Sequence, residues 1–319
     1  MAYKKAAKKY SGEIREVTLG SGDKAVAIGG KNVLPIHSFD GNVGNPPKIG
    51  LEIVDIVPED WHDDLKKIYD GVLEDTAEWA KFAVDNFAPD FICLRFAGAD
   101  PDGKNKSVEE CVETAKKVAA AVDLPLVIAG TKNVEKDEKL FSAVAEALAG
   151  ENVLILSARE ENYKTVGAAG ALAYKHKIAA ETSVDINLAK QLNILMNQLG
   201  VQNEDLVMNV GSAAVGYGFE YLSSTMDRII LAALGQNDST LQMPIITPVS
   251  TETWTVKESA ASEDDEPAWG SSIERAIQME VATAAAVLVS GADAIIVRHP
   301  KSLATMKTFI SNMLGSGLN

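Results

Sequence analysis

The chain contains 319 residues, a length that suits one large α/β barrel or two average domains. Its 45 acidic and 30 basic side chains give a formal charge of −15 at pH 7, which argues against binding nucleic acid or an anionic membrane through overall attraction. The sequence contains no stretch of about 18 apolar residues and no apolar segment of a secretory signal, so we expect a cytoplasmic protein that does not span a membrane.

The chain has two cysteines, Cys93 within an apolar stretch and Cys111 within a helical pattern. Both are expected to be buried thiols, since free cysteine is among the most buried residue types. Two cysteines cannot supply the four thiolates of an iron–sulfur cluster or of a structural zinc site. The four histidines are widely separated in the sequence, so we predict no metal site in this chain.

Residues 13–30 show a weak alternation of apolar and polar residues on either side of a turn with two glycines, residues 20–23. This pattern predicts a β-hairpin. An irregular segment that contains proline and glycine, residues 41–47, follows it. We therefore expect residues 1–48 to form an N-terminal extension with a β-hairpin.

From residue 49 onward, short apolar stretches alternate with helical patterns. The short stretches are apolar throughout, as in strands that are covered on both faces, and each helical pattern places one apolar stripe toward a sheet. The eight predicted strands are residues 49–56, 90–96, 125–129, 153–157, 177–182, 206–210, 244–249 and 293–298. Eight strand–helix units over residues 49–314 match the roughly 250-residue size of a (β/α)₈ TIM barrel. Residues 315–319 are expected to be a disordered tail.

An open doubly wound sheet is the alternative fold. A dinucleotide-binding sheet of that kind carries a glycine-rich loop, G-x-G-x-x-G, directly after its first strand. Here the loop after the first predicted strand is acidic, with Pro58, Glu59 and Asp60. The sequence therefore favours the barrel.

Two helix starts carry a serine followed three residues later by a glutamate: Ser107 with Glu110, and Ser271 with Glu274. In a capping box the hydroxyl and the carboxylate accept hydrogen bonds from the free amide groups of a helix start. The sequence therefore predicts a capping box at both places.

Residues 250–270 form the longest predicted loop. It contains six acidic residues and one lysine around Trp254 and Trp269. One interpretation is a solvated loop. The other is a lid or a loop that docks a partner, because loops longer than about 12 residues in compact domains are often functional.

In a (β/α)₈ barrel the residues at the carboxyl ends of the strands face the ligand site. No pair among them here has a known catalytic spacing. Lys132 would act as a Schiff-base amine only if it were desolvated, and we expect Arg298 to pair with an acidic neighbour or an anionic group. Asn187 and Asn209 offer donor and acceptor without charge, which suits a ligand rich in amides or heterocyclic nitrogens. The predicted strand-end residues are Asp55, Arg95, Asp100, Thr131, Lys132, Ser157, Arg159, Glu181, Thr182, Asn209, Thr247, Arg298 and His299.

Seven short segments follow the predicted hairpin in a characteristic order. They are LEIVDIVP (51–58), VEKDEKLFSAVAEA (134–147), ENYK (161–164), DINLAKQLNIL (185–195), GYGFEY (216–221), MDRI (226–229) and VRHP (297–300). Together they resemble the small subunit of the corrinoid iron–sulfur protein, which is the delta subunit of the acetyl-CoA decarbonylase/synthase system. The resemblance covers nearly the whole chain, and it is the combination of segments that is specific.

The resemblance implies a barrel that forms a heterodimer with a large subunit. That large subunit would carry the iron–sulfur cluster and a corrinoid-binding domain, and the corrinoid (cobalamin) would lie between that domain and the upper face of this barrel. The cobalt would take a methyl group from a methyl-tetrahydropterin through a separate methyltransferase and hand it to acetyl-CoA synthase/CO dehydrogenase, in the reductive acetyl-CoA (Wood–Ljungdahl) pathway. This chain would then be a non-catalytic subunit, without catalytic residues or metal ligands.

We expect this subunit to cover one face of the corrinoid with an apolar, uncharged surface, because a cobalt(I) nucleophile must be shielded from protons and water until the methyl donor arrives. The residues expected on the corrinoid-facing side are Thr182, Asn187, Asn209, Gly211, Gly216, Tyr217, Gly218 and Arg298.

Two other functions fit the same fold class, because fold alone does not separate a carrier from an enzyme. One is a pterin-dependent methyltransferase barrel, which would recruit Asp55, Asn187 and Asn209 to bind the pterin. The other is an aldolase-like enzyme that uses Lys132.

Overall fold

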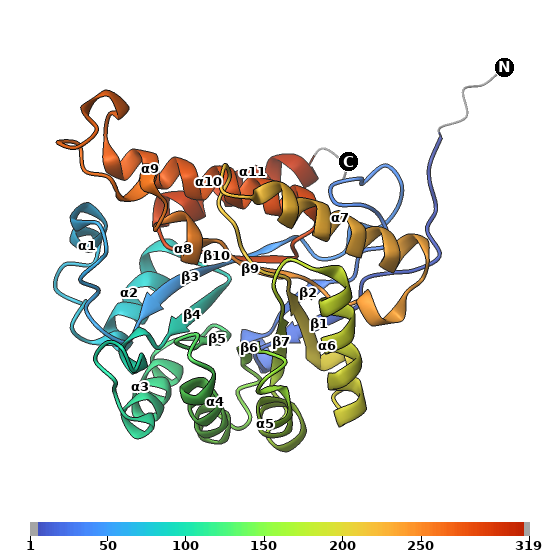
Figure 1. Cartoon of the computed structure of the whole chain (residues 1–319), viewed down its shortest axis with the longest axis horizontal. Coiled ribbons are helices and arrows are strands. Elements are labelled where there is room, and N and C mark those ends of the chain that lie inside the picture. Colours follow the sequence, from blue (N-terminus) through green and yellow to red (C-terminus); the bar gives the residue numbers. More distant parts are fainter. Residues whose placement is uncertain (1–5, 316–319) are drawn as a thin grey trace.

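The computed structural model describes residues 6–315 and has a parallel eight-stranded sheet at its centre, in the order β8-β7-β6-β5-β4-β3-β10-β9 (Figure 1). The strands are β3 (Lys48–Val54), β4 (Phe91–Arg95), β5 (Leu126–Ala129), β6 (Leu154–Ala158), β7 (Lys177–Glu181), β8 (Leu206–Asn209), β9 (Ile246–Pro248) and β10 (Ala294–Val297). A parallel bridge between Met208 and Ile245 joins the two end strands. The sheet is therefore a barrel, and the predicted (β/α)₈ fold is confirmed.

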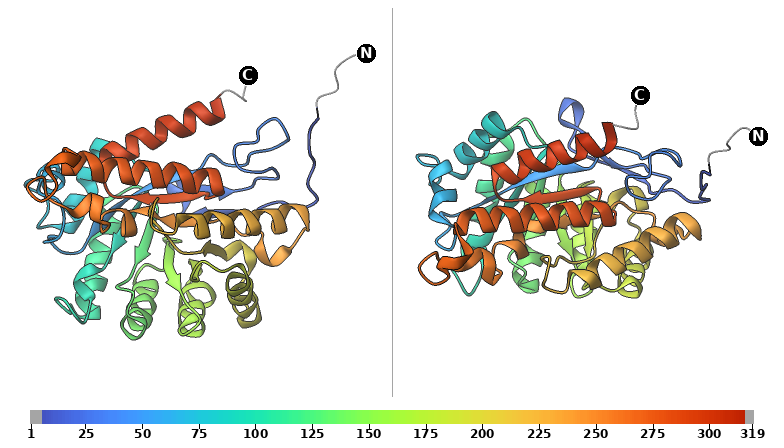
Figure 2. Two further views of the ribbon diagram at one scale, coloured as in Figure 1. Left: turned by 45° about the horizontal axis from the view of Figure 1, so that its top comes forward. Right: turned by 90° about the horizontal axis from the view of Figure 1, so that it is seen from above.

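Helices follow the strands and surround the barrel, and α10 and α11 lie side by side along it (Figure 2). The helices are α1 (Asp63–Ile68), α2 (Thr76–Phe87), α3 (Val108–Ala121), α4 (Val134–Ala147), α5 (Tyr163–Gly167), α6 (Ile186–Leu199), α7 (Phe219–Gly235), α8 (Val249–Thr253), α9 (Lys257–Ala260), α10 (Ser272–Ser290) and α11 (Pro300–Gly315). The expected tail lies, from residue 316 on, outside the described residues. Within residues 6–315, no helix combines the length and hydrophobicity needed to cross a membrane.

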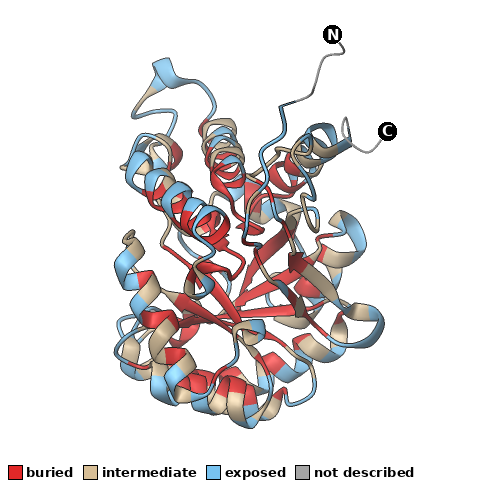
Figure 3. Cartoon of the chain, turned by 90° about the vertical axis from the view of Figure 1, so that its right-hand side faces the viewer, coloured by how far each residue is buried: buried red, intermediate tan, exposed pale blue. Residues whose placement is uncertain are grey.

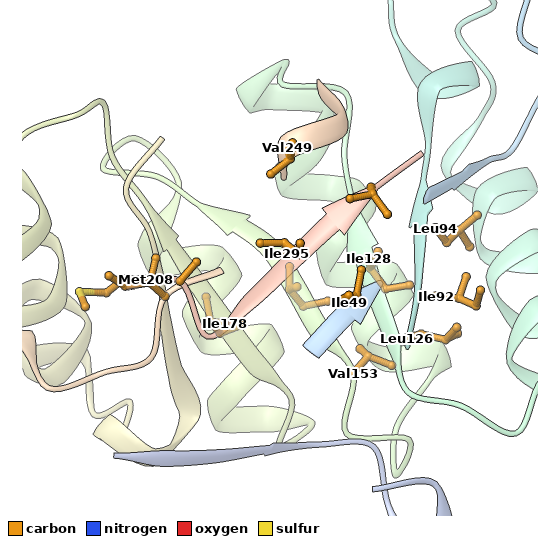
Figure 4. Packing of buried hydrophobic residues seen from close by; sticks show 14 of the residues in the cluster. Ile49, Ile92, Leu94, Leu126, Ile128, Val153, Ile178, Met208, Val249 and Ile295 are labelled. Atoms are coloured by element: carbon orange, nitrogen blue, oxygen red, sulfur yellow. The ribbon is translucent and has the colours of Figure 1, made fainter. Parts of the chain in front are cut away.

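Two apolar clusters form the core, one on each side of the barrel wall. Buried residues fill the strands and the inward faces of the helices (Figure 3). The outer cluster packs strand residues such as Ile49, Ile92 and Ile295 against the helices (Figure 4). The inner cluster fills the barrel with the alternate strand residues, among them Phe91 and Val207. Both faces of each strand are therefore buried, which explains why the strands are apolar throughout.

The N-terminal hairpin closes the amino end of the barrel. Strands β1 (Glu16–Leu19) and β2 (Val26–Gly29) pair antiparallel, as predicted. Their buried side chains, including Leu19, belong to the cluster inside the barrel. Gly20 N donates a hydrogen bond to Asn152 O at 2.9 Å and Lys24 Nζ donates one to Val122 O at 3.1 Å, and both acceptors precede a barrel strand. The amino end is thus sealed, which leaves the carboxyl end as the open face.

One of the two predicted capping boxes is present. The Ser107 hydroxyl accepts a hydrogen bond from Glu110 N, and the Glu110 carboxylate accepts one from Ser107 N. At α10 the prediction is wrong, because the Ser271 side chain makes no cap hydrogen bond. The Glu274 carboxylate instead accepts hydrogen bonds from Lys301 Nζ at 2.7 and 2.8 Å. An ion pair with a neighbouring helix has replaced the local cap.

Residues 250–270 are more ordered than the predicted loop. They contain part of α8, the whole of α9 and a 3₁₀ turn, Pro267–Trp269. Trp254 is only 8% exposed, and its indole Nε1 donates to Glu280 Oε1 at 2.9 Å. The segment is therefore anchored to α10 by a buried hydrogen bond, which a polar local sequence does not reveal. Both cysteines are buried, as predicted.

Candidate functional site

The carboxyl ends of the strands surround a pocket of about 110 Å³, which we call the central pocket. Side chains alternate between the two faces of a strand, so Arg95, Glu181 and Asn209 lie on the same face as Cys93, Ala179 and Val207, which fill the barrel. Six of the predicted strand-end residues line the central pocket: Arg95, Lys132, Ser157, Arg159, Glu181 and Asn209.

A buried ion cluster lies next to the central pocket. Glu52 is fully buried inside β3, and its carboxylate accepts hydrogen bonds from Arg95 Nε and, at 3.1 Å, from Arg298 Nε. Burial by itself raises the pKa of the Glu52 carboxyl, but the positive charges of Arg298 and Arg95 outweigh that effect and lower it to about 2. The expected pairing of Arg298 with an acidic neighbour is confirmed. Arg95 also donates to Thr251 Oγ1 at 2.8 Å.

Sequence reasoning missed Glu52. The only signal was a single acidic residue within the apolar strand that begins at Lys48. Glu52 is paired in register with Cys93, whose side chain lies in the inner cluster. An ionised acidic side chain that points into a barrel interior requires a cationic partner. Two of the predicted strand-end arginines, Arg95 and Arg298, are the partners here.

Two more ion pairs flank the central pocket, and the buried Asp137 carboxylate in its lining accepts hydrogen bonds from Thr131 N at 2.7 Å and Lys132 N at 2.9 Å. Arg159 Nη2 lies 2.5 Å from Glu181 Oε1, and Lys132 Nζ lies 3.4 Å from Glu252 Oε1. The Lys132 side chain is 53% exposed, whereas a Schiff-base lysine needs a desolvated or cationic environment to lower its pKa. The aldolase-like alternative therefore lacks the environment that it requires.

A second hollow, of about 400 Å³, adjoins the central pocket and is called here the side groove. Gly211 and Ser212 line both, and Thr182 lines the side groove. The side groove is more apolar than the central pocket, because Leu188 and Leu192 of α6 form one of its walls. The buried Thr182 Oγ1 has no hydrogen-bond partner among the described residues.

The connection between β8 and α7, residues 210–218, is uncharged and lies beside the side groove. Its glycines 216 and 218 have φ angles of +88° and +81°, which favour glycine. A Cβ atom on Gly216 would meet no other atom within 4 Å, and one on Gly218 would meet only Tyr221, at 3.6 Å. Tyr217 and Tyr221 are 47% and 69% exposed. The connection thus presents backbone and aromatic surface outward.

The predicted site residues fall into five places. Asn209 and Gly211 line the central pocket, and Thr182 and Gly211 line the side groove. Gly216, Tyr217 and Gly218 lie on the exposed connection, and Asn187 is exposed at the start of α6. Arg298 lines a separate cavity of about 640 Å³, next to α1 and α9, which gather on one side of the molecule in Figure 1.

The expected uncharged surface is limited to the β8–α7 connection. The central pocket beside it contains Arg95, Lys132 and Arg159 together with acidic partners. These residues were predicted at the strand ends, but the expected ligand surface was uncharged. Within residues 6–315, no three His, Cys, Asp or Glu side chains form a group that suits a metal ion.

Comparison with solved structures supports the fold. Dihydropteroate synthase from Xanthomonas albilineans, in complex with indole-2-carboxylic acid and 6-chloroguanine, superposes with a TM-score of 0.56 at 10% identity, over 93% of this chain and 98% of that one. Dihydropteroate synthase from Coxiella burnetii, in complex with pteroic acid, gives a TM-score of 0.54 at 11% identity, over 88% and 98% of the two chains. At this level of identity the similarity concerns the barrel alone.

Comparison with known sequences gives the family. The family model described as CO dehydrogenase/acetyl-CoA synthase delta subunit matches residues 16–310. The acetyl-CoA decarbonylase/synthase complex subunit delta 1 of Methanosarcina thermophila is 32% identical over 320 aligned positions, which cover 96% of this chain and 72% of the relative. Subunit delta of Methanothermobacter thermautotrophicus is 32% identical over 307 positions, 93% of this chain and 75% of the relative. The resemblance noted in the sequence is thus confirmed, and the chain belongs to the CO dehydrogenase/acetyl-CoA synthase delta subunit family.

Proposed function

We propose that this chain is a non-catalytic subunit that covers a corrinoid held by a large partner subunit. The observation that carries the proposal is the uncharged, outward-facing β8–α7 connection, with glycines 211, 216 and 218 and the exposed Tyr217. A flat macrocycle needs a surface that it can approach closely and that does not place charge against it. Family membership supplies the context of a multi-subunit complex.

The exposed β8–α7 connection supports the placement of a corrinoid over it. Gly216 and Gly218 add no side chain where the ring would lie, and Tyr217 and Tyr221 offer aromatic contact area. When bound, the corrinoid supplies a cobalt centre that accepts and releases a methyl group. This chain's residues would exclude water from one face of the ring, and the Arg95–Glu52–Arg298 cluster would hold the barrel mouth in place.

The proposal includes specific partners. The large subunit would carry the iron–sulfur cluster and the corrinoid domain, in a heterodimer with this chain. A methyl-tetrahydropterin methyltransferase would load the methyl group, and acetyl-CoA synthase/CO dehydrogenase would receive it. The name of the relatives, subunits of an acetyl-CoA decarbonylase/synthase complex, supports an assembly of this kind.

A pterin-dependent methyltransferase barrel is the second candidate, and it would share its barrel fold with the similar dihydropteroate synthase that was solved with pteroic acid. The central pocket argues against it, because a volume of about 110 Å³ is well below the roughly 300–1,000 Å³ of pockets that enclose a small-molecule ligand. A pterin would therefore not fit within the central pocket alone and would have to extend into the adjoining side groove of about 400 Å³.

Replacing Gly218 by tryptophan is expected to weaken corrinoid retention by the heterodimer about tenfold or more, because the bulky side chain would occupy the space of the ring; tenfold is about 1.4 kcal/mol. Retention is measured from the visible spectrum of the heterodimer after gel filtration. The matched control is Gly150→Trp. Gly150 also has a positive φ, +95°, with nothing within 4 Å of a Cβ atom, and it follows α4 at the closed end of the barrel. Equal retention in both variants would exclude the proposed contact surface.

A further inference from the structure

The central pocket is too small for a whole ligand, and its lining includes buried polar side chains. Its volume of about 110 Å³ holds a group the size of one amino-acid side chain, whereas whole small molecules need roughly 300–1,000 Å³. Gly211 and Ser212 line both the central pocket and the side groove. A ligand that lies over the β8–α7 connection therefore has its edge at the mouth of the central pocket.

The charged side chains that line the central pocket balance in number: three are cationic (Arg95, Lys132, Arg159) and three are acidic (Asp137, Glu181, Glu252). Arg95 is paired with Glu52, which also binds Arg298, and the pairs Arg159–Glu181 and Lys132–Glu252 flank the pocket. The Asp137 carboxylate is held by hydrogen bonds from the backbone amides of Thr131 and Lys132. An ionised ligand group would have to separate one of these pairs or remain unpaired, and an unpaired charge in a partly buried site is costly. The walls therefore select an uncharged group.

Two buried polar side chains, Ser157 and Asn209, lie within the central pocket and have hydrogen-bonding capacity to spare. They are 7% and 3% exposed. Asn209 Nδ2 donates to Ser157 Oγ at 3.3 Å, and Gly211 N donates to Asn209 Oδ1 at 3.3 Å, whereas hydrogen bonds in proteins are typically about 2.9 Å. Most buried side-chain polar atoms have at least one hydrogen-bond partner, and an amide can make up to four such bonds. A ligand with both a donor and an acceptor would satisfy them.

We propose that the central pocket binds an uncharged primary carboxamide, and that this carboxamide is one of the amide side chains at the edge of the corrinoid ring. A carboxamide has one acceptor and two donors, which complement the side-chain amide of Asn209 and the hydroxyl of Ser157. This inference rests on the proposed function, since it takes the corrinoid as the ligand above the β8–α7 connection. The central pocket would fix the rotation of the ring about its axis, which the smooth loop surface does not do.

The test compares cobalamin with its monocarboxylic acids, in each of which one side-chain amide is hydrolysed. The heterodimer is loaded with each compound, and the dissociation constant is measured from the visible spectrum. One of these acids would place a carboxylate in the central pocket. Its dissociation constant is expected to be about tenfold or more above that of cobalamin, because the carboxylate would find no unpaired cation there. The other acids are expected to bind as cobalamin does.

Asn209→Leu keeps the size of the side chain and removes both its donor and its acceptor. It is expected to weaken cobalamin binding about tenfold, the effect of roughly one lost hydrogen bond, and to abolish the discrimination against that one acid. The control is Asn193→Leu, which removes another buried amide. Asn193 lies on α6, is not among the residues that line the central pocket, and donates through Nδ2 to Thr240 O at 2.9 Å. This control is expected to preserve both the affinity and the discrimination.

The outcomes separate the two proposals. If the heterodimer binds corrinoid and Gly218→Trp disrupts it, but Asn209→Leu behaves as Asn193→Leu and no acid is disfavoured, the carboxamide assignment is wrong and the capping function stands. If Gly218→Trp has no effect, the capping function itself fails. If Asn209→Leu weakens binding of methyl-tetrahydrofolate to the isolated chain and leaves corrinoid binding unchanged, the central pocket serves a pterin and the assignment is overturned.

Discussion

Replacing Glu52 by glutamine is expected to lower the free energy of unfolding by about 3–5 kcal/mol, the usual cost of removing one partner from a buried ion pair. Glu52 is fully buried and accepts hydrogen bonds from both Arg95 and Arg298. The substitution leaves two guanidinium groups in the barrel mouth without a counter-charge. Urea unfolding of the wild type and the variant measures the difference.

An exposed ion pair provides the matched control. Arg15 Nη1 lies 2.7 Å from Glu204 Oε1, and the two side chains are 34% and 58% exposed. Such pairs contribute at most about 1 kcal/mol, so Glu204→Gln should change the unfolding free energy little. Similar small losses in both variants would show that Glu52 does not stabilise the barrel mouth.

The pH dependence of stability in the wild type and in Glu52→Gln tests the pKa of Glu52. Folding lowers this pKa from 4.5 to about 2, so the charged carboxylate stabilises the folded state above pH 4.5, and this contribution is lost as the pH falls toward 2. The stability difference between wild type and Glu52→Gln should therefore be constant near neutral pH and shrink in acid. A difference that grows as the pH decreases would contradict the assigned ionisation.

Replacing Leu19 by alanine is expected to cost about 2–5 kcal/mol of unfolding free energy, the range for emptying a fully buried leucine site. Leu19 has no exposed surface and belongs to the cluster that fills the barrel. Its truncation leaves a cavity between the hairpin and the closed end of the barrel. Thermal or urea unfolding measures the loss.

The control for Leu19 is Leu231→Ala on α7, where nearly half of the residue's surface, 46%, is already in water. Its loss should be far smaller, because little apolar area leaves a buried environment. Equal decreases in unfolding free energy for the two variants would show that the hairpin does not contribute to the barrel core.

The barrel was predictable because its signals are local. Strands covered on both faces are apolar throughout, and all eight such stretches became strands. The hairpin was also predicted, but its role as the closure of the barrel depends on contacts such as that of Gly20 with Asn152, 132 residues away in the sequence. No pattern within a hairpin of two short strands reveals such a contact.

Part of the site was also predictable from local sequence signals. Strand ends place polar residues at the open face, so Asn209 and Arg95 were expected there and do line the central pocket. An acidic neighbour was expected for Arg298, but Glu52 as the shared partner of Arg298 and Arg95 was not predicted, because it depends on which face of β3 points inward and on two strands far apart in the sequence. The anchoring of Trp254 by Glu280 escaped prediction likewise, since it links a polar segment to a buried acid in α10.

The measurement that tests the central claim most directly is purification of this chain alone and with a co-expressed large subunit, followed by determination of cobalt, iron and the visible spectrum. We predict that corrinoid and iron are present only in the heterodimer and that the isolated chain contains neither. If the isolated chain instead binds a methyl-tetrahydropterin and methylates cob(I)alamin unaided, the chain is a methyltransferase and the capping function is contradicted.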